Sequence, residues 1–480
     1  MRRAAVAGNR PNSVVFINPP GPAKLYRSTT CTYVSKANYI WQPLDFISLS
    51  ALVPVEDALA FYDCSVQGWT EAALFSRLAD TAPDLAIIAL SSIVYDQDLS
   101  FLRNFRSRFP STRVLLLGDL FLEHAFREKG LALADGLVLN PMDIDLAGYI
   151  RTNTSCSPNL VLRGAPDRAP EPESKAAPRK VDLGVPRHEL FLSRSYRFPF
   201  AHAYLYSTVS TQFGCPFQCQ YCTQCKIPVT YRDHQEVLQE LELVGRLGVQ
   251  EVFFGDPSFG FPQENARLLL EGMIAKGLRL GWSCYANPGL IDFAFLRLMQ
   301  RAGCHTVIIG VEDEDMDMLQ AQYKRNLSKP RLLEFSNHCR QLKVRVCGDF
   351  IIGLNSDEQA VHRMVAFARR LQLDYASFNI FIPLLGSRVR ERMVQDGKLD
   401  PLAVGVDTSG TFGKSHERVL ALRNMAIRKF YLRPSYLLRR LAMIRGWEEF
   451  IIHFQEMTAM LKDHLFKKDR PSTGPGAGQR

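Results

Sequence analysis

The chain is 480 residues long, more than one hydrophobic core usually takes, so two or three domains are expected. It is 46% hydrophobic and 22% charged, and no apolar run is long enough to predict a transmembrane helix. The basic N-terminus precedes no apolar segment, which argues against a secretory signal. A cytoplasmic location is therefore expected, where clustered cysteines indicate a metal site or catalysis rather than disulfides.

The first part of the chain alternates short apolar segments with helix-like segments such as 70–82 and 98–109. Five of the apolar segments are predicted strands: 14–18, 59–64, 85–91, 113–119 and 136–140. Nearly continuous apolar strands with helices between them are typical of a parallel sheet covered on both faces. The sequence therefore predicts an α/β fold that begins with a doubly wound, Rossmann-like domain over residues 1–152. Its ligand should lie beyond the carboxyl ends of the strands.

Residues 153–200 break the alternation with a stretch rich in Pro, Ala and charge, and they predict a linker that ends in an ordered strap. A second alternation follows over residues 201–395. Its six predicted strands are 204–213, 251–256, 281–286, 306–312, 344–354 and 375–384. Six β/α units predict a partial (β/α)6 barrel of the TIM type, whose chemistry lies at the carboxyl ends of its strands.

The C-terminal part is predicted to be helical over residues 396–466 and disordered over 467–480. Residues 414–469 contain twice as many Lys and Arg as Asp and Glu. This region is either a solvated basic helix face or a peripheral contact with an anionic membrane surface. Nucleic acid is not an expected partner.

Four cysteines gather directly after the first predicted barrel strand, in the stretch "GCPFQCQYCTQC" (214–225). A structural zinc site usually takes two separated ligand pairs, and no second Cys or His pair follows at the usual spacing. A single loop can instead wrap several corners of a [4Fe–4S] cluster. An iron–sulfur centre is therefore favoured. The alternative that stays open is a binding protein, rather than an enzyme, whose cysteines hold a structural zinc ion.

Cys215, Cys219 and Cys222 form the C-x3-C-x2-C motif of the radical S-adenosylmethionine (SAM) superfamily, with Tyr221 before the third cysteine. The chain resembles this family over about residues 200–390. The resemblance implies that three thiolates hold three irons and that the fourth iron binds SAM. SAM is then cleaved to a 5′-deoxyadenosyl radical, with electrons from a donor such as a flavodoxin or ferredoxin. Cys225 is expected to be dispensable, because the fourth iron must stay free for SAM.

Later barrel segments extend this resemblance. "FFGDPSFGF" (253–261) resembles the second-strand segment that meets the amino group of SAM, with Asp256 as the expected acceptor or, alternatively, a turn residue. "GCHTVIIGVEDED" (303–315) resembles the fourth-strand segment and implies that Gly310 and Glu312 lie near the cofactor.

The first domain resembles the cobalamin-binding domains that precede the barrel in one class of the superfamily. Those domains often carry D-x-H-x-x-G, whose His ligates cobalt, and this chain has "DCSVQG" with Asp63, Ser65 and Gly68. A serine hydroxyl is a poor cobalt ligand, so no protein side chain is expected on cobalt through this motif. Two further cofactor loops are expected at Ser91–Ser92 and at Gly118. The domain could also keep the fold without binding cobalamin.

The tail segment "RKFYLRPSYLLRRL" (428–441) resembles the branch that includes anaerobic Mg-protoporphyrin ester cyclase, hopanoid-modifying enzymes and many methyltransferases. The resemblance implies a cobalamin-dependent methyltransferase that acts on an unactivated carbon of a small-molecule or lipid-like substrate. The alternative within the family is a radical SAM cyclase or rearrangement enzyme without methyl transfer.

Overall fold

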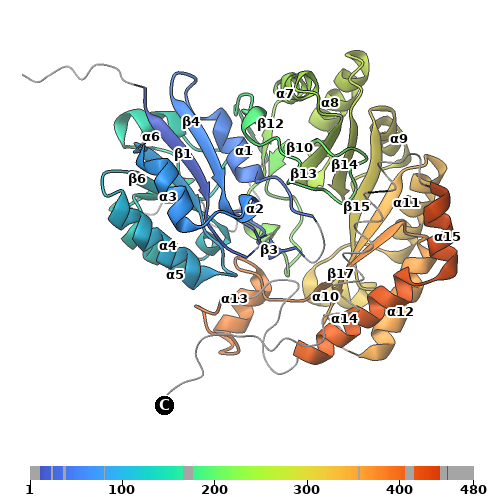
Figure 1. Ribbon diagram of the computed structural model, residues 1–480. Helices are drawn as coiled ribbons and strands as arrows, with labels where there is room; N and C mark the ends of the chain where they lie inside the picture. The colour runs from blue at the N-terminus through green and yellow to red at the C-terminus, as the bar shows by residue number, and fades with distance from the viewer. Residues whose placement is uncertain are drawn as a thin grey trace, which may run out of the picture.

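The computed structural model describes residues 11–22, 25–35, 39–80, 82–165, 177–354, 357–405, 416–443 and 451. Two six-stranded sheets lie side by side, one in the N-terminal and one in the central part of the chain (Figure 1). Helices of the C-terminal part pack against the second sheet. The predicted fold class is confirmed, whereas the predicted domain boundaries stay a prediction.

The first sheet has the strand order β4-β1-β5-β6-β7-β8. Its strands are β1 (Ser13–Asn18), β4 (Ala58–Asp63), β5 (Leu85–Ala89), β6 (Arg113–Leu117), β7 (Gly136–Val138) and β8 (Leu160–Leu162). The first five are parallel and correspond to the five predicted strands. The order reverses between β1 and β5, and in doubly wound sheets this switch point is where ligands bind.

One strand of the first sheet lies outside the prediction. β8 belongs to the segment expected to be a linker, and it pairs antiparallel with β7. It is only three residues long at the edge of the sheet, so it leaves no periodic signal amid the Pro-rich and charged residues around it.

Both faces of the first sheet are covered by helices, as its continuous apolar strands predict. In β1, Val14 and Phe16 pack toward one set of helices, and Val15 and Ile17 pack toward the other. The first set is α1 (Leu44–Ala51) and α6 (Leu146–Thr152). The second set is α3 (Glu71–Ala79), α4 (Tyr95–Arg108) and α5 (His124–Leu133). The four-residue α2 (Cys64–Gln67) follows β4.

The second sheet is an open parallel barrel whose strands follow one another in chain order. They are β10 (Tyr206–Val209), β13 (Glu251–Phe259), β14 (Gly281–Ala286), β15 (Cys304–Glu312), β16 (Arg345–Ile352) and β17 (Tyr375–Ile380). Its outer helices are α7 (His234–Arg246), α8 (Gln263–Ala275), α9 (Phe293–Arg301), α11 (Lys329–Gln341) and α12 (Glu358–Arg370). A shorter helix, α10 (Met316–Tyr323), follows β15.

The predicted strand 204–213 is wrong as one continuous strand. β10 ends at Val209, and β11 (Gln212–Phe213) joins β12 (Thr230–Arg232) and β9 (Arg179–Val181) in a separate small sheet. The chain leaves the barrel because the Asp256 carboxylate accepts the backbone N–H groups of Thr211 and Gln212. The cysteine loop therefore follows a turn and a hairpin strand rather than the barrel strand itself.

The open edge and the interior of the barrel are filled by segments from outside it. Gln42 accepts the N–H of Thr208 and donates to the C=O of Tyr206, so its amide pairs with edge strand β10. Ile40 and Phe198 pack against inward-facing barrel residues such as Phe253. The strands thus enclose a packed core at this level rather than a channel.

The C-terminal helices are α13 (Arg388–Gln395), α14 (His416–Tyr431) and α15 (Pro434–Met443). The hydroxyl of Tyr431 donates to the C=O of Ala376 and accepts its N–H, and the Tyr436 hydroxyl donates to the C=O of Asp374. Both tyrosines therefore tie the tail to β17. No helix within the described residues combines the length and apolar character needed to cross a membrane. The predicted helix beyond residue 443 and the predicted tail lie outside the described residues, residue 451 excepted.

Candidate active site

The three motif cysteines lie on the loop between β11 and β12. The loop begins at Gly214, whose φ is +82° and where a Cβ would lie 2.4 Å from the C=O oxygen of Pro228, so only glycine fits there. Burial raises the pKa of the Cys215 thiol to about 11 and raises that of Cys222, and in both cases Cys219 adds to the rise. The three thiols are therefore close enough to act on one another, with Cys219 buried and Cys215 and Cys222 half-buried.

The spacing of the cysteines differs from that of a mononuclear zinc site. Zn–S bonds of about 2.3 Å place tetrahedral ligands roughly 3.8 Å apart. Among the described residues, only His202, Glu251 and His305 bring three ligand atoms of this kind within 4.8 Å of one another. The three motif sulfurs do not all lie within that distance of one another, so the loop does not hold them as tetrahedral zinc ligands, and the zinc clamp is not favoured.

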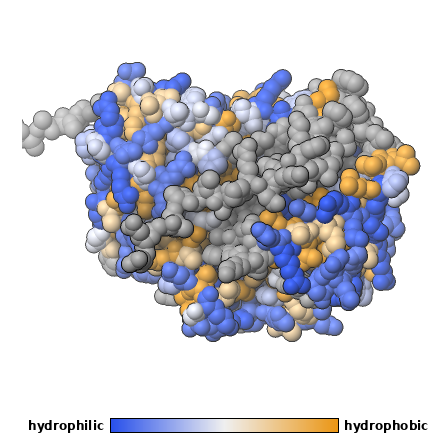
Figure 2. Space-filling view, turned by 60° about the horizontal axis from the view of Figure 1, so that its bottom comes forward, coloured by the Kyte–Doolittle hydropathy of each residue, from blue (hydrophilic) through white to orange (hydrophobic). Residues whose placement is uncertain are grey.

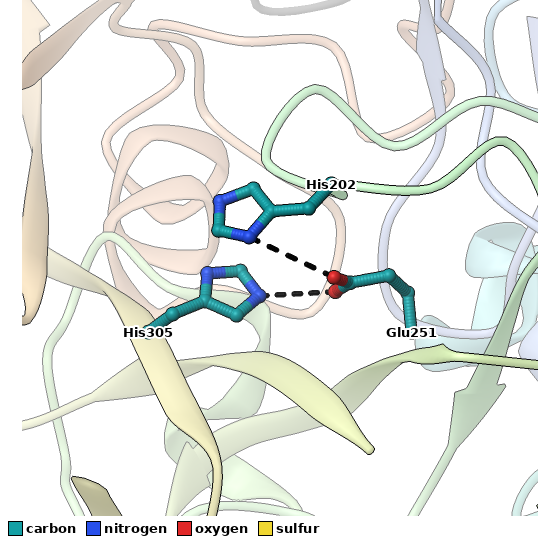
Figure 3. Close-up of side chains that lie close together, drawn as sticks. All are labelled: His202, Glu251 and His305. Atoms are coloured by element: carbon teal, nitrogen blue, oxygen red, sulfur yellow. Dashed lines mark hydrogen bonds and ion pairs between the residues drawn. The ribbon is translucent and has the colours of Figure 1, made fainter. Parts of the chain in front are cut away.

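His202, Glu251 and His305 lie at the opposite, amino end of the barrel strands (Figure 3). The two imidazoles stack, with ring centroids 3.9 Å apart and 27° between the planes. Because the lone pairs of ring nitrogens lie in the ring plane, stacked rings do not direct two nitrogens at one ion. Arg345 also donates to Nε2 of His202 at 3.0 Å, and His305 donates to Glu251 at 3.0 Å. This cluster is a hydrogen-bonded network rather than a metal site.

At the carboxyl end of β15, Glu312 folds back over Gly310. Glu312 has a φ of +66°, a left-handed conformation that is uncommon for a residue with a side chain. A Cβ on Gly310 would lie 2.2 Å from Oε1 of Glu312, so a side chain at this position would displace the Glu312 carboxylate. Burial raises the pKa of Glu312, and the nearby guanidinium of Arg325 opposes that rise. The two residues predicted to lie near the cofactor thus contact each other at the end of β15, beside Arg325.

Arg325 is part of this site and was not predicted from the sequence. Its Nη2 donates to the C=O of Gly310 at 2.6 Å, and its Nη1 lies 3.7 Å from the sulfur of Cys219. It stands in the polar stretch between α10 and α11, where no motif marks it. The arginine therefore connects the cysteine loop to the carboxyl end of β15.

Asp256 is held by the chain itself. Its two carboxylate oxygens accept hydrogen bonds from Ser210 Oγ, Thr211 N, Thr211 Oγ1 and Gln212 N at 2.6–3.1 Å. Burial raises its pKa to about 6 against these hydrogen bonds. The structure therefore places Asp256 on the turn that leads into the cysteine loop, in keeping with the turn alternative, and its predicted SAM contact stays a prediction.

Several buried polar atoms around the cysteine loop have no protein partner in the described part of the chain. They include Nε of Arg325, Oε1 of Gln212 and Oε1 of Gln224. Buried polar groups are nearly always hydrogen-bonded, so such atoms indicate a polar ligand that the protein does not supply. Together with the spread thiols, they fit a [4Fe–4S] cluster with bound SAM.

The residues predicted for cobalamin lie at the carboxyl edge of the first sheet. Asp63 ends β4, and Oδ2 of its carboxylate accepts the Tyr196 hydroxyl at 2.7 Å. Ser65 donates to the C=O of Pro19 at 3.0 Å and accepts Nη1 of Arg27 at 3.1 Å. Gly68 ends α2 with a φ of +66°. The Ser65 hydroxyl is thus occupied by protein contacts, which agrees with the expectation that it is no cobalt ligand.

Arg27 is a second site residue that the sequence reading missed. Its side chain is fully buried, pairs with Asp98 at 2.7 Å and donates to Oδ1 of Asn18 at the end of β1. A buried arginine at this edge had no signal in the sequence, because its ion-pair partner Asp98 lies 71 residues further along the chain. Arg27 fills space at the switch point between β1 and β5.

The other two predicted cofactor loops are packed closely together. The N–H and the hydroxyl of Ser92 both donate to Asp119, and the N–H of Ser91 donates to Asp98 at 2.8 Å. A Cβ on Gly118 would lie 2.2 Å from the C=O oxygen of Leu90, so glycine lets these loops approach. The side chains of these loops already fill the space between them. A flat ligand would therefore have to lie over the ends of the strands, where the strand order of this sheet places a binding site.

The two sheets meet beside the cysteine loop. The Thr223 hydroxyl donates to the C=O of Thr30 at 2.9 Å, and the Asn140 amide donates to the Thr230 hydroxyl at 3.2 Å. A crevice of about 1070 Å³ follows this joint, lined by residues such as Leu52, Ile144, Arg179, Thr223 and Lys226. The cysteine loop is therefore enclosed by both parts of the protein.

Comparisons with known proteins agree with this geometry. Residues 209–368 match the family model described as the radical SAM superfamily. An uncharacterised methyltransferase of Pyrococcus horikoshii is 24% identical over 270 residues, which is 54% of this chain and 58% of that protein. The hopanoid C-2 methylase of Rhodopseudomonas palustris is 24% identical over 267 residues, 52% of this chain and 49% of that protein. The chain thus spans about half the length of the curated relatives it matches.

Two solved structures share the fold. The radical SAM methyltransferase TsrM of Kitasatospora setae, with cobalamin and a [4Fe–4S] cluster bound, aligns with a TM-score of 0.60 and 15% identity. That alignment covers 80% of this chain and 75% of TsrM. The cobalamin-dependent radical SAM enzyme OxsB, with aqua-cobalamin and SAM bound, aligns with a TM-score of 0.61 and 12% identity, over 95% of this chain and 72% of OxsB. At these identities the likeness concerns the fold.

Proposed function

We propose that the chain, whose residues 209–368 match the radical SAM family model, is a [4Fe–4S]-dependent enzyme of that superfamily that cleaves SAM to a 5′-deoxyadenosyl radical. The radical abstracts a hydrogen from a small-molecule or lipid-like substrate, and the most favoured reaction is cobalamin-dependent methylation of an unactivated carbon. The observation that carries the proposal is the enclosed cysteine loop, which meets the carboxyl end of β15 through Arg325.

In this function Cys215, Cys219 and Cys222 hold the cluster. Tyr221, Gly310 and Glu312 line the space where SAM binds. The cluster supplies the electron that cleaves SAM, and we propose an external donor such as a flavodoxin or ferredoxin for its reduction. The protein residues bind and orient these groups and exclude water, which the burial of the loop supports.

Cobalamin is the proposed second cofactor. The flavodoxin-like strand order, the switch point beside β1 and the shared fold with TsrM and OxsB support it. Asp63, Ser65, Gly68, Ser91, Ser92 and Gly118 are the proposed contacts at the sheet edge. Because Ser65 is engaged by Arg27 and Pro19, we propose that the cofactor lies over the strand ends with no ligand to cobalt from this motif.

The function can be tested without a known substrate, by measuring the two products that SAM itself yields. The protein would be reconstituted anaerobically with iron and sulfide, with and without hydroxocobalamin, and reduced in the presence of SAM. We expect 5′-deoxyadenosine to require the reductant, and S-adenosylhomocysteine to form only when cobalamin is present, because only methyl transfer yields that product.

The possible outcomes separate the alternatives. Formation of 5′-deoxyadenosine without S-adenosylhomocysteine under every condition would favour the cyclase or rearrangement reaction. Bound zinc, together with a failure to take up iron, would overturn the radical SAM function itself.

We also propose that α14 and α15 form a peripheral contact with anionic membranes from a cytoplasmic location. Leu432, Leu437 and Leu438 are 48%, 41% and 68% exposed, and Arg428 and Lys429 lie in the last turn of α14. Apolar atoms also gather at the right-hand edge of Figure 2, on the side where Figure 1 places α15. Exposed leucines beside basic residues are typical of helices that bind at the surface of anionic membranes.

Vesicle flotation tests this contact. We expect the protein to float with phosphatidylglycerol vesicles and not with phosphatidylcholine vesicles, and Leu438→Ser to weaken the association several-fold. Leu402→Ser is the matched control, because Leu402 is also exposed, at 40%, but lies outside these helices. Equal binding by wild type and both variants would contradict the contact.

A further inference from the structure

We propose that Arg325 is a positioning residue for the iron–sulfur cluster, whose guanidinium holds the Cys219 thiolate and raises the reduction potential of the cluster. The inference rests on the proposed function, since it concerns a cluster held by Cys215, Cys219 and Cys222. It goes beyond that function by assigning the control of electron transfer to a residue outside the cysteine motif.

The contacts of Arg325 fix its guanidinium against the loop. Its Nη1 lies 3.7 Å from the sulfur of Cys219, and its Nη2 donates to the C=O of Gly310 at 2.6 Å. Arg325 is only 8% exposed. Other cations near the loop have other partners: Lys226 pairs with Glu391 at 2.8 Å, and Arg392 donates to the side-chain oxygen of Gln220. Of these three cationic side chains, Arg325 is the one that contacts the sulfur of a motif cysteine.

The end of α10 places Arg325 in this position. Lys324 caps the helix in a left-handed conformation, with a φ of +53°, which turns the chain inward. The N–H of Arg325 then donates to the C=O of Leu319 at 3.1 Å. The cysteine loop docks on the same helix end, where the N–H of Gln220 donates to the C=O of Tyr323 at 3.0 Å. The arginine and the loop are therefore held by one rigid element.

The direction of the effect follows from charge. Arginine stays protonated in proteins, so the guanidinium is a permanent positive charge. Reduction adds one negative charge to a cluster that already carries thiolates. A fixed cation in a buried site stabilises the more negative, reduced state, and hydrogen bonds to the ligating sulfur act in the same direction. Removing Arg325 should therefore make the cluster harder to reduce.

The test compares Arg325→Met, Arg325→Lys and the control Arg331→Met, each reconstituted as the full chain. Methionine removes the positive charge and keeps much of the aliphatic side chain. Lysine keeps the charge but has one nitrogen, so it cannot contact Cys219 and Gly310 through two separate nitrogens as arginine does. Arg331 is also partly buried and bonded to backbone C=O groups, but these belong to Pro288 and Ile291, between β14 and α9, and not to the cysteine loop. The readout is the midpoint potential, from titration followed by electron paramagnetic resonance, without SAM so that no cofactor contact contributes.

We expect all variants to take up as much iron as the wild type. Arg325→Met should shift the midpoint to a more negative potential, Arg325→Lys should shift it less, and Arg331→Met should leave it unchanged. An unchanged potential in an iron-loaded Arg325→Met would overturn the proposal. Loss of iron in both Arg325 variants would also overturn it, because Arg325 would then serve cluster assembly. A wild type that takes up no iron would instead refute the proposed function.

Discussion

Replacing any one of Cys215, Cys219 and Cys222 with alanine is expected to abolish SAM cleavage and to lower the bound iron after reconstitution. In the proposed function each thiolate holds one iron, and a cluster that already leaves one iron open to SAM loses a second protein ligand in each variant. The expected loss is complete within detection, since no other step supplies the electron. Iron content, the visible absorption of the cluster and 5′-deoxyadenosine formation are the measurements.

Cys225→Ala is the matched control for this series. Cys225 lies on the same loop and is buried, at 6% exposed, and its N–H donates to the C=O of Cys222 at 3.3 Å, a backbone contact that alanine keeps. We expect this variant to keep its iron and its activity. Full SAM cleavage by a variant of any of the three motif cysteines, or loss of iron in Cys225→Ala, would contradict the assignment.

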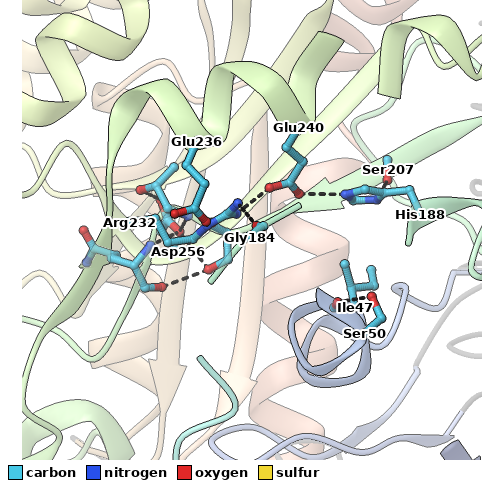
Figure 4. Close-up of polar contacts among 12 residues, drawn as sticks. Ile47, Ser50, Gly184, His188, Ser207, Arg232, Glu236, Glu240 and Asp256 are labelled. Atoms are coloured by element: carbon cyan, nitrogen blue, oxygen red, sulfur yellow. Dashed lines mark hydrogen bonds and ion pairs between the residues drawn. The ribbon is translucent and has the colours of Figure 1, made fainter. Parts of the chain in front are cut away.

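Glu240→Ala should be among the most destabilising single changes outside the cysteine loop. Glu240 of α7 accepts Nη1 of Arg232 and lies 2.7 Å from Nε2 of His188, whose other ring nitrogen is 2.7 Å from the Ser207 hydroxyl (Figure 4). Burial raises the pKa of Glu240, but Arg232 and His188 lower it more, so the carboxylate is charged at neutral pH. Arg232 keeps its ion pair with Glu236 at 2.8 Å, but the removal leaves buried donor groups of Arg232 and His188 without an acceptor, at a cost of about 1–3 kcal/mol for each.

A second variant on the same helix controls for the loss of a carboxylate. Glu242 pairs with Lys276 at 2.5 Å, but this ion pair is exposed to solvent, so Glu242→Ala should lower the stability much less than Glu240→Ala. Unfolding midpoints in urea, followed by circular dichroism, compare the two. Similar midpoints for Glu240→Ala and Glu242→Ala would show that the buried network contributes little.

The strand pattern could be predicted from the sequence because buried parallel strands leave long apolar runs. Strands such as 113–119 and 281–286 were recognised in this way, and each lies within two residues of β6 or β14. The apolar pattern does not predict where a strand ends when hydrogen bonds to residues far along the chain determine that end. Asp256 bends the segment 204–213 out of the barrel, and nothing within that segment indicates it.

The cysteine motif could be predicted because its three cysteines lie close together in the sequence. The arginines that contact the predicted sites could not be predicted. Arg325 follows Cys219 by more than one hundred residues and reaches it only because α10 ends in a left-handed turn. Arg27 reaches Ser65 and Asp98 from a hairpin, β2 (Leu25–Tyr26) and β3 (Tyr33–Val34), too short to show periodicity. Such residues acquire their roles through tertiary contacts alone.

The pairing of Gln42 with β10 has a consequence for how this protein can be divided. A fragment that begins at residue 201 would contain every barrel strand, yet the N–H of Thr208 and the C=O of Tyr206 would stand open along its first strand. Open strand edges recruit other chains, so such a fragment would aggregate. The barrel therefore depends on a residue of the N-terminal half to cover its first strand.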